Sequence, residues 1–171
     1  MDIQTVQMLD EYNRHVNKEM NAIIKGLNAE QWNRKFGGYF PSIHALCNHI
    51  YICDFNWLKR FSRLREFEFV KDTLFNKSIG FDAVAIGPIK DYIAKREALD
   101  EHIGKFVKEI KEEDLGKKLK YIDSEGNEYN RMFGGLILHI FNHATHHRGM
   151  ISLYLEEMGI ANDYSNLVEI L

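Results

Sequence analysis

Apolar residues recur every three or four positions along four stretches of the chain, the spacing that an amphipathic helix shows. These stretches cover residues 2–27, 43–61, 88–110 and 133–158. Ser42 is a good amino-terminal cap for the second stretch, and a proline at position 88 suits the first turn of the third. The pattern therefore predicts four long helices that bury their apolar faces against one another, an all-α four-helix bundle.

The connections between these helices differ in length. Residues 28–41 are expected to form a loop whose aromatic side chains, Trp32, Phe36, Tyr39 and Phe40, pack on the bundle rather than bind a ligand. Residues 62–87 mix charges and aromatic side chains without a clean period, so they are expected to form one long crossover with at most a short helix.

The segment before the last long helix carries a turn signal. Ser124-Glu125-Gly126-Asn127 separates two short runs that can pair as a small β-hairpin. Residues 163–171 are expected to form a final short helix or strand that covers the end of the bundle. The sequence contains no internal repeat and no glycine-rich phosphate loop. Its pattern predicts one domain over residues 1–171.

Composition restricts the function classes. A chain of 171 residues with 45% hydrophobic residues can bury one substantial core. Its net charge of −3 argues against a nucleic-acid partner, which would require clustered excess lysine and arginine. It has no apolar run of membrane-spanning length and no signal-peptide pattern, and Cys47 and Cys53 lie too far apart on one helix to form a disulfide. We therefore expect no membrane partner and a reduced, cytoplasmic setting.

Four of the eight histidines, His139, His143, His146 and His147, lie within nine residues of the last helix. Side chains four positions apart on a helix lie one above the other, about 6 Å apart along the axis, and can hold one metal ion between them. The candidate pairs are His139/His143, His143/His146 and His143/His147. The apolar stripe of this helix lies on roughly the face that carries His143 and His147, so we expect that pair to point inward.

Two histidines are too few for a metal site, because catalytic zinc takes three protein ligands plus a water. His49, on the inner edge of the second helix, is the best candidate for the third ligand. His44 lies one turn nearer the loop, and His15 and His102 are on other helices. Cys53, one turn after His49, is a candidate fourth ligand. A site of His49, His143, His147 and water would be open for chemistry.

Few other side chains suggest a role. Tyr12 and Asn13 of the first helix are candidate pocket residues, although side chains of this kind also pack or form caps. Arg148 would point about 100° away from its neighbour His147 and is expected to form a salt bridge. The carboxylates are expected on the outer faces of the helices, and no pair of them suggests an acid and a base.

Several motifs together resemble a known family. They are SIHALCNHI at residues 42–50, HIFNHATHHRGM at 139–150, the helix end EEMGIANDY, the segment YIDSEGNEYNRMFGG and YNRHVN at 12–17. The whole resembles the DinB/YfiT-like superfamily of metal-dependent proteins, and N-H-x-x-H-H-R-G is its most specific part. Met150 stands where the family pattern has glutamine, which removes any polar contact of that side chain but leaves the ligand positions intact.

The resemblance implies a four-helix bundle, often a homodimer, that holds one divalent ion on three histidines. Residue by residue these are His49, His143 and His147, while His139 and His146 would support the site or the fold. Similar proteins include thiol-dependent transferases and isomerases that use bacillithiol or mycothiol.

The expected function is accordingly a Zn²⁺- or Ni²⁺-dependent transferase that joins a low-molecular-weight thiol to a small electrophilic substrate. Imidazole ligands alone do not select between these ions. The alternatives are a metal-dependent hydrolase and a non-catalytic bundle that binds a metal or another ligand.

Overall fold

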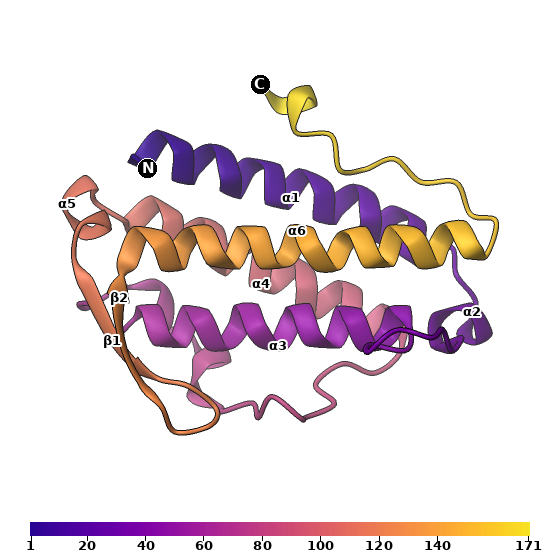
Figure 1. The fold of residues 1–171 in the computed structure, drawn as a ribbon, viewed down its shortest axis with the longest axis horizontal. Coiled ribbons are helices and arrows are strands. Elements are labelled where there is room, and N and C mark those ends of the chain that lie inside the picture. Colours follow the sequence, from indigo (N-terminus) through magenta and orange to yellow (C-terminus); the bar gives the residue numbers. More distant parts are fainter.

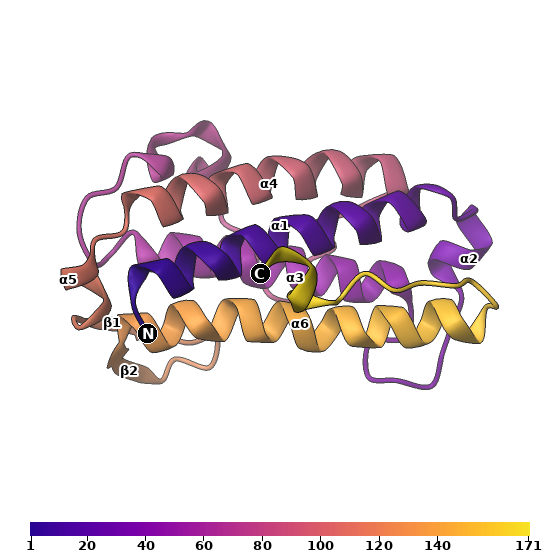
Figure 2. The same cartoon turned by 90° about the horizontal axis from the view of Figure 1, so that it is seen from above.

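Four long helices make up most of the chain, in a computed structural model that describes residues 1–171. They are α1 (Ile3–Lys25), α3 (Ile43–Phe61), α4 (Ile89–Glu109) and α6 (Phe133–Glu157). Figures 1 and 2 show them lying side by side along the long axis of the molecule. The predicted four-helix bundle is confirmed, and each helix lies within three residues of its expected bounds.

The order of the helices around the bundle explains the long crossover. Helix α1 packs against α4 and α6, and α3 packs against the same two helices, so α1 and α3 occupy opposite corners. Helices α3 and α4 run in the same direction (Figure 1), so the chain between them must return along the length of the bundle. This crossover contains two single 3₁₀ turns, η1 (Phe69–Lys71) and η2 (Thr73–Asn76), in place of the one short helix expected.

The helix that carries His49 begins where the sequence predicts. The Ser42 hydroxyl accepts a hydrogen bond of 3.1 Å from the Ala45 amide, which satisfies one of the free N–H groups of the first turn of α3. Helix α6 ends just before Gly159, whose φ of 73° allows the Ile160 amide to donate back to the Leu155 carbonyl at 2.9 Å. Both histidine-bearing helices therefore have ends fixed by local chemistry.

The predicted hairpin is present and leads directly into α6. Strands β1 (Lys118–Ile122) and β2 (Glu128–Met132) pair antiparallel, with Tyr121 opposite Tyr129. Gly126 adopts a φ of 89° in the connecting loop, a conformation that glycine tolerates best. A short helix that the sequence pattern did not predict, α5 (Glu112–Leu115), precedes the hairpin.

Two expectations about the connections are wrong. Residues 28–41 contain a short helix, α2 (Ala29–Asn33), which forms because Asn28 and Gln31 cap each other's backbone amides. Tyr39 in the same segment is 91% exposed, so it does not pack on the bundle.

The carboxyl-terminal segment does not cover the end of the bundle. It runs back along α1 and α6 to the short turn η3 (Leu167–Ile170), as Figures 1 and 2 show. The Tyr12 hydroxyl donates to the Ser165 carbonyl at 2.7 Å, and the Tyr164 hydroxyl to the Arg148 carbonyl at 2.9 Å. These tyrosines fix the segment along the side of the bundle.

The core contains charged residues that the sequence pattern placed outside. Arg96 of α4 is 1% exposed and donates to Asp54 and to Asp100, each at 2.7 Å. The expectation that the carboxylates lie on outer faces is therefore wrong for these two. They are stable inside because the guanidinium binds one carboxylate with each terminal nitrogen.

These charges extend into a chain of buried contacts across all four long helices. The Asn17 amide donates to Asp100 at 2.9 Å, and Arg148 donates to the side-chain oxygens of Asn17 at 3.1 Å and Asn13 at 2.5 Å. We call Asn13, Asn17, Asp54, Arg96, Asp100 and Arg148 the buried polar network. None of the helices combines the length and apolar character needed to cross a lipid bilayer.

Candidate metal centre

Three histidine side chains from two adjacent helices converge on one point. His49 of α3 places its Nε2 3.1 Å from Nε2 of His143, and His147 places its Nε2 3.1 Å from the same atom. His143 and His147 lie one helical turn apart in α6, which packs against α3. The structure thus brings together the three residues that spacing and family resemblance single out. We refer to them as the histidine centre.

Hydrogen bonding alone does not account for both short contacts. A neutral imidazole nitrogen carries either one proton or one lone pair. If Nε2 of His143 carries the proton, it can donate to one neighbour only, and the other contact then lacks a proton acceptor. If it carries the lone pair, both neighbours must share it. Three nitrogens that face one another are better satisfied by a cation between them.

The spacing of the nitrogens also suits a metal ion. Two imidazole nitrogens that each lie about 2.0–2.1 Å from one zinc ion, at a tetrahedral angle, are about 3.4 Å apart. The two observed separations of 3.1 Å are close to this value. The donor set and its geometry therefore fit a divalent ion held by His49, His143 and His147.

The environment of the centre keeps these imidazoles neutral, as metal ligands must be. Burial lowers the pKa of His49, His143 and His147 to about 4 each. The positive charge that each would gain near the others lowers the pKa further, because like charges repel. Protons therefore compete weakly with a metal ion for these nitrogens at neutral pH.

Phe40 forms a wall of the centre that sequence reasoning did not assign. Its ring stacks on His49 with 4.2 Å between centroids and meets the edge of His147 at 5.3 Å. Phe40 packs on the bundle, as expected for the aromatic residues of its segment, but it does so on two of the three histidines. The Tyr154 hydroxyl donates to its backbone carbonyl at 2.9 Å, which anchors this part of the loop.

Cys53 lies beside the centre. Its Sγ is 3.7 Å from both ring nitrogens of His49, and the sulfur and the nearest donor atoms of His49 and His143 all lie within 4.8 Å of one another. A zinc-bound thiolate and imidazole would be separated by about 3.6 Å, so this distance also permits a fourth ligand. Burial raises the pKa of the Cys53 thiol to about 12, which favours the neutral thiol in the metal-free protein.

The remaining histidines have other neighbours. His44 bonds the Ile86 carbonyl at 2.9 Å, His15 lies 3.9 Å from Glu169, and His102 bonds the Ala98 carbonyl at 2.7 Å. His139 meets the edge of the Trp57 ring, and His146 is exposed on the outer side of α6. None of these five joins the three nitrogens of the histidine centre.

The two candidate pocket residues have partners other than the three histidines. Tyr12 and Asn13 are buried between α1 and α6, where Asn13 accepts a hydrogen bond from Arg148. Their hydrogen bonds do not include the three histidines, although Arg148, which contacts both residues, directly follows His147 in the chain. The salt bridge expected for Arg148 is absent, because its guanidinium binds the neutral side chains of Asn13, Asn17 and Thr145.

The sequence as a whole matches the model of the DinB family over residues 1–168. The chain belongs to the DinB family. The family member called protein DinB, from Bacillus subtilis strain 168, is 27% identical over 156 residues, which cover 90% of this chain and 86% of that protein. The match spans both helices of the histidine centre.

A solved structure supports the same fold. The crystal structure of a DinB-like protein from Bacillus subtilis superposes with a TM-score of 0.61 and covers 94% of this chain and 97% of that one. At 15% sequence identity this similarity shows the arrangement of the helices alone. Family membership and fold therefore agree with the resemblance seen in the sequence motifs.

Proposed function

We propose that this DinB-family protein is a metal-dependent enzyme that joins a low-molecular-weight thiol to a small electrophilic substrate, with Zn²⁺ or Ni²⁺ as its ion. The observation that carries the proposal is the convergence of three neutral imidazole nitrogens, 3.1 Å apart in two contacts, on one point. When bound there, a divalent ion would supply a Lewis acid that favours the thiolate form of a thiol near neutral pH.

The residues of the chain divide the remaining tasks. His49, His143 and His147 hold the ion from one side, since all three belong to the packed helices α3 and α6. Phe40 covers His49 and His147 and limits access of water on that side. His49 and His143 are themselves only partly buried, which leaves a route from solvent to the centre for a small molecule.

Two alternatives use the same three histidines. In a hydrolase, water takes the place of the thiol at the open position. In a non-catalytic metal-binding protein, Cys53 closes the site as a fourth ligand, and its 3.7 Å distance from His49 is the observation that favours this reading. The two kinds of site differ in whether an added thiol can enter.

The test is a screen of thiol and electrophile pairs with metal-loaded protein, in which loss of free thiol is measured. We expect turnover with the wild-type protein and none with His143→Ala, which removes the nitrogen shared by both short contacts. The matched control is His146→Ala, on the exposed outer side of α6, which should keep most of the activity.

Cys53→Ser separates an open from a closed site. If the site is open, this variant binds the metal and turns over thiol much like the wild type. If Cys53 is a ligand, the substitution weakens metal binding by tenfold or more, and no thiol pair is consumed by the wild-type protein. That second pattern would overturn the proposed transferase activity.

A further inference from the structure

A row of aromatic side chains extends from the histidine centre toward the hairpin along the surface between α3 and α6. His139 lies 5.7 Å from His143 and meets the edge of Trp57 at 5.4 Å, measured between ring centroids. Trp57 in turn contacts Tyr121 of β1 at 5.2 Å. Trp57 and Tyr121 are only partly buried, so a molecule at the centre can lie against this row.

One cation lies at the far end of the row. The Arg60 guanidinium is 4.8 Å from the centre of the Trp57 ring, 5.5 Å from that of Tyr121 and 5.3 Å from that of Phe81. Contacts with the faces of aromatic rings hold a guanidinium in place and leave its N–H groups free to donate. We call Arg60, Trp57, Phe81 and Tyr121 the Arg60 strip.

Arg60 has no carboxylate partner, unlike several other arginines. Arg14, Arg65 and Arg96 each lie within 3.1 Å of a carboxylate. Arg60 makes only one long hydrogen bond, 3.5 Å to the Ile122 carbonyl, although burial is sufficient to lower its pKa. A partly buried guanidinium that is positioned by rings and lacks an anion is well suited to bind one.

The nearby acidic residue is already engaged. Asp123 is the carboxylate whose charge acts on Arg60, but its Oδ1 accepts hydrogen bonds from the Glu125 and Asn127 backbone amides, each at 2.9 Å, and its Oδ2 accepts one from the Asn127 side chain at 3.1 Å. These bonds form the turn of the hairpin. Asp123 therefore stabilises the loop and leaves the Arg60 N–H groups without an acidic partner.

The position of Arg60 sets the distance between the histidine centre and an anion bound by the guanidinium. Arg60 is eleven residues after His49 on nearly the same face of α3, about 16 Å along the helix axis. Helical side chains lean toward the amino terminus, and the guanidinium lies over Trp57, three residues nearer the centre. The guanidinium is therefore on the order of 10–15 Å from the histidine centre.

We propose that Arg60 binds a carboxylate of the thiol co-substrate, so that the protein selects thiols whose carboxylate lies on the order of 10–15 Å from the sulfur. This inference rests on the proposed function, since it assumes that the sulfur reaches the histidine centre. It excludes thiols as short as cysteine, whose sulfur and carboxylate are too close together to reach both sites.

A series of ω-mercaptocarboxylates tests the length requirement directly. Extended chains of mercaptopropionate, mercaptooctanoate and mercaptoundecanoate separate sulfur and carboxylate by about 4, 10 and 14 Å at about 1.2 Å per bond. Thiol affinity is read from the thiolate-to-metal absorbance of cobalt-loaded protein. Mercaptooctanol, of equal length to the octanoate but without charge, is the matched ligand control.

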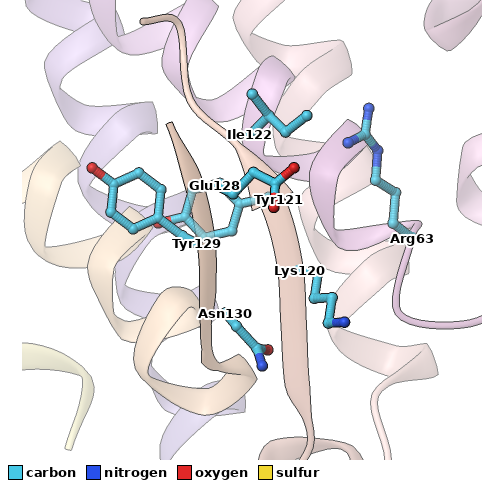
Figure 3. A pocket seen from close by; sticks show the side chains of 7 residues that line it. All are labelled: Arg63, Lys120, Tyr121, Ile122, Glu128, Tyr129 and Asn130. Atoms are coloured by element: carbon cyan, nitrogen blue, oxygen red, sulfur yellow. The ribbon is translucent and has the colours of Figure 1, made fainter. Parts of the chain in front are cut away.

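We expect the two longer acids to bind about tenfold more tightly than mercaptooctanol and mercaptopropionate. A factor of about ten in affinity corresponds to the free energy that one hydrogen bond to a charged group usually contributes. Arg60→Gln should abolish this advantage without changing metal binding. Arg63→Gln is the control for loss of a nearby positive charge, because the charge of Arg63 acts on Arg60, while Arg63 lies on the other side of the hairpin from the ring of Tyr129 (Figure 3).

The outcomes separate this inference from the proposed function. Equal affinity for the octanoate and the octanol, or an unchanged preference in Arg60→Gln, overturns the role of Arg60 while thiol binding at the metal stands. If no metal binds, the proposed function fails. Titration of the metal-free protein with octanoate, followed by the NMR signal of the Arg60 Nε–H group, then decides the inference. An unmoved signal overturns it.

Discussion

Two polar regions meet in α6, where His147 belongs to the histidine centre and the next residue, Arg148, to the buried polar network. In the network, the charged groups have partners: Arg96 contacts both Asp54 and Asp100 through its terminal nitrogens, although its Nε is left without one, and Arg148 contacts two asparagine oxygens. In the histidine centre, two imidazole nitrogens approach one nitrogen of His143, which can offer only one proton or one lone pair. The first region pairs its opposite charges with one another, whereas the second gathers like groups, an arrangement that fits the proposed metal ion.

Burial distinguishes the regions in the same way. Arg96 and Arg148 are 1% and 2% exposed, so no small molecule can reach them without opening the bundle. His49 and His143 are partly exposed and have a solvent-accessible row of rings beside them. Polar residues in a helix bundle therefore indicate a binding site when they converge, lack partners and remain accessible.

Breaking the network should cause the largest loss of stability. Arg96→Met leaves the carboxylates of Asp54 and Asp100 buried without a cation, and we expect the free energy of unfolding to fall by about 3–5 kcal/mol. Urea denaturation at pH 7 measures this. Arg63→Met, on the surface, should change it by less than about 0.5 kcal/mol. Equal stabilities for the two variants would show that the network is not structural.

Much of the histidine centre could be predicted from the sequence, because short-range rules determine where two of its residues lie. The four-residue spacing fixes His143 and His147 on one face, and the Ser42 cap fixes the start of the helix that carries His49. That His49 meets them depends on which helices are neighbours, which periodicity alone does not give. The place of His49 on the inner edge of its helix makes it the best candidate for the third ligand, and the motif resemblance implies the same residue.

The features that were missed depend on tertiary contacts. Phe40 lies in a loop, whose path across the histidines follows no period. Arg96 and Asp100 are charged, so they were expected outside, although Arg96 lies three residues after Ile93 on the buried stripe of α4. Tyr12 and Asn13 are polar residues on an inner face, and nothing local shows that they point toward Arg148 rather than the histidines.

Removing one member of the histidine centre should abolish stabilisation by metal. Zinc at about 100 times its dissociation constant should raise the unfolding free energy of the wild type by about 2.7 kcal/mol. His146→Ala, on the exposed side of α6, should retain this gain, whereas the neighbouring His147→Ala should lose most of it. Thermal unfolding with and without zinc measures the difference. A full gain in His147→Ala would contradict the ligand assignment.

A carboxylate at the edge of the network should respond to pH. Burial raises the pKa of Asp10 to about 6, and its Oδ1 is buried without a hydrogen-bond partner. The folded state holds the Asp10 proton more tightly than the unfolded state, whose pKa is near 3.8. This contribution to stability is fully present below pH 3.8 and is lost as pH rises through 6. Asp10→Asn should therefore exceed the wild type in stability at pH 8 by about 1 kcal/mol, and not at pH 4. Denaturation curves of the wild type and Asp10→Asn at pH 4 and pH 8 test this.

The smallest expected effect is the change in zinc affinity of the histidine centre with pH. The ligand histidines have pKa values of about 4, so protonation should lower zinc affinity by less than about twofold between pH 7.5 and 5.5. Imidazoles at the ordinary pKa of about 6.5 would each cost about tenfold over that range. Competition titration with a chelator of known affinity distinguishes these outcomes. A steep loss of affinity beginning near pH 6.5 would show that the centre does not keep its imidazoles neutral.

The central claim is that His49, His143 and His147 hold one divalent ion and leave a position open. X-ray absorption at the zinc edge of protein loaded with one equivalent of zinc tests it most directly. The account predicts three imidazole nitrogens at about 2.0–2.1 Å and no sulfur near 2.3 Å, with a sulfur signal appearing only when a thiol is added. A sulfur ligand in the thiol-free protein, or fewer than three imidazoles, would contradict it.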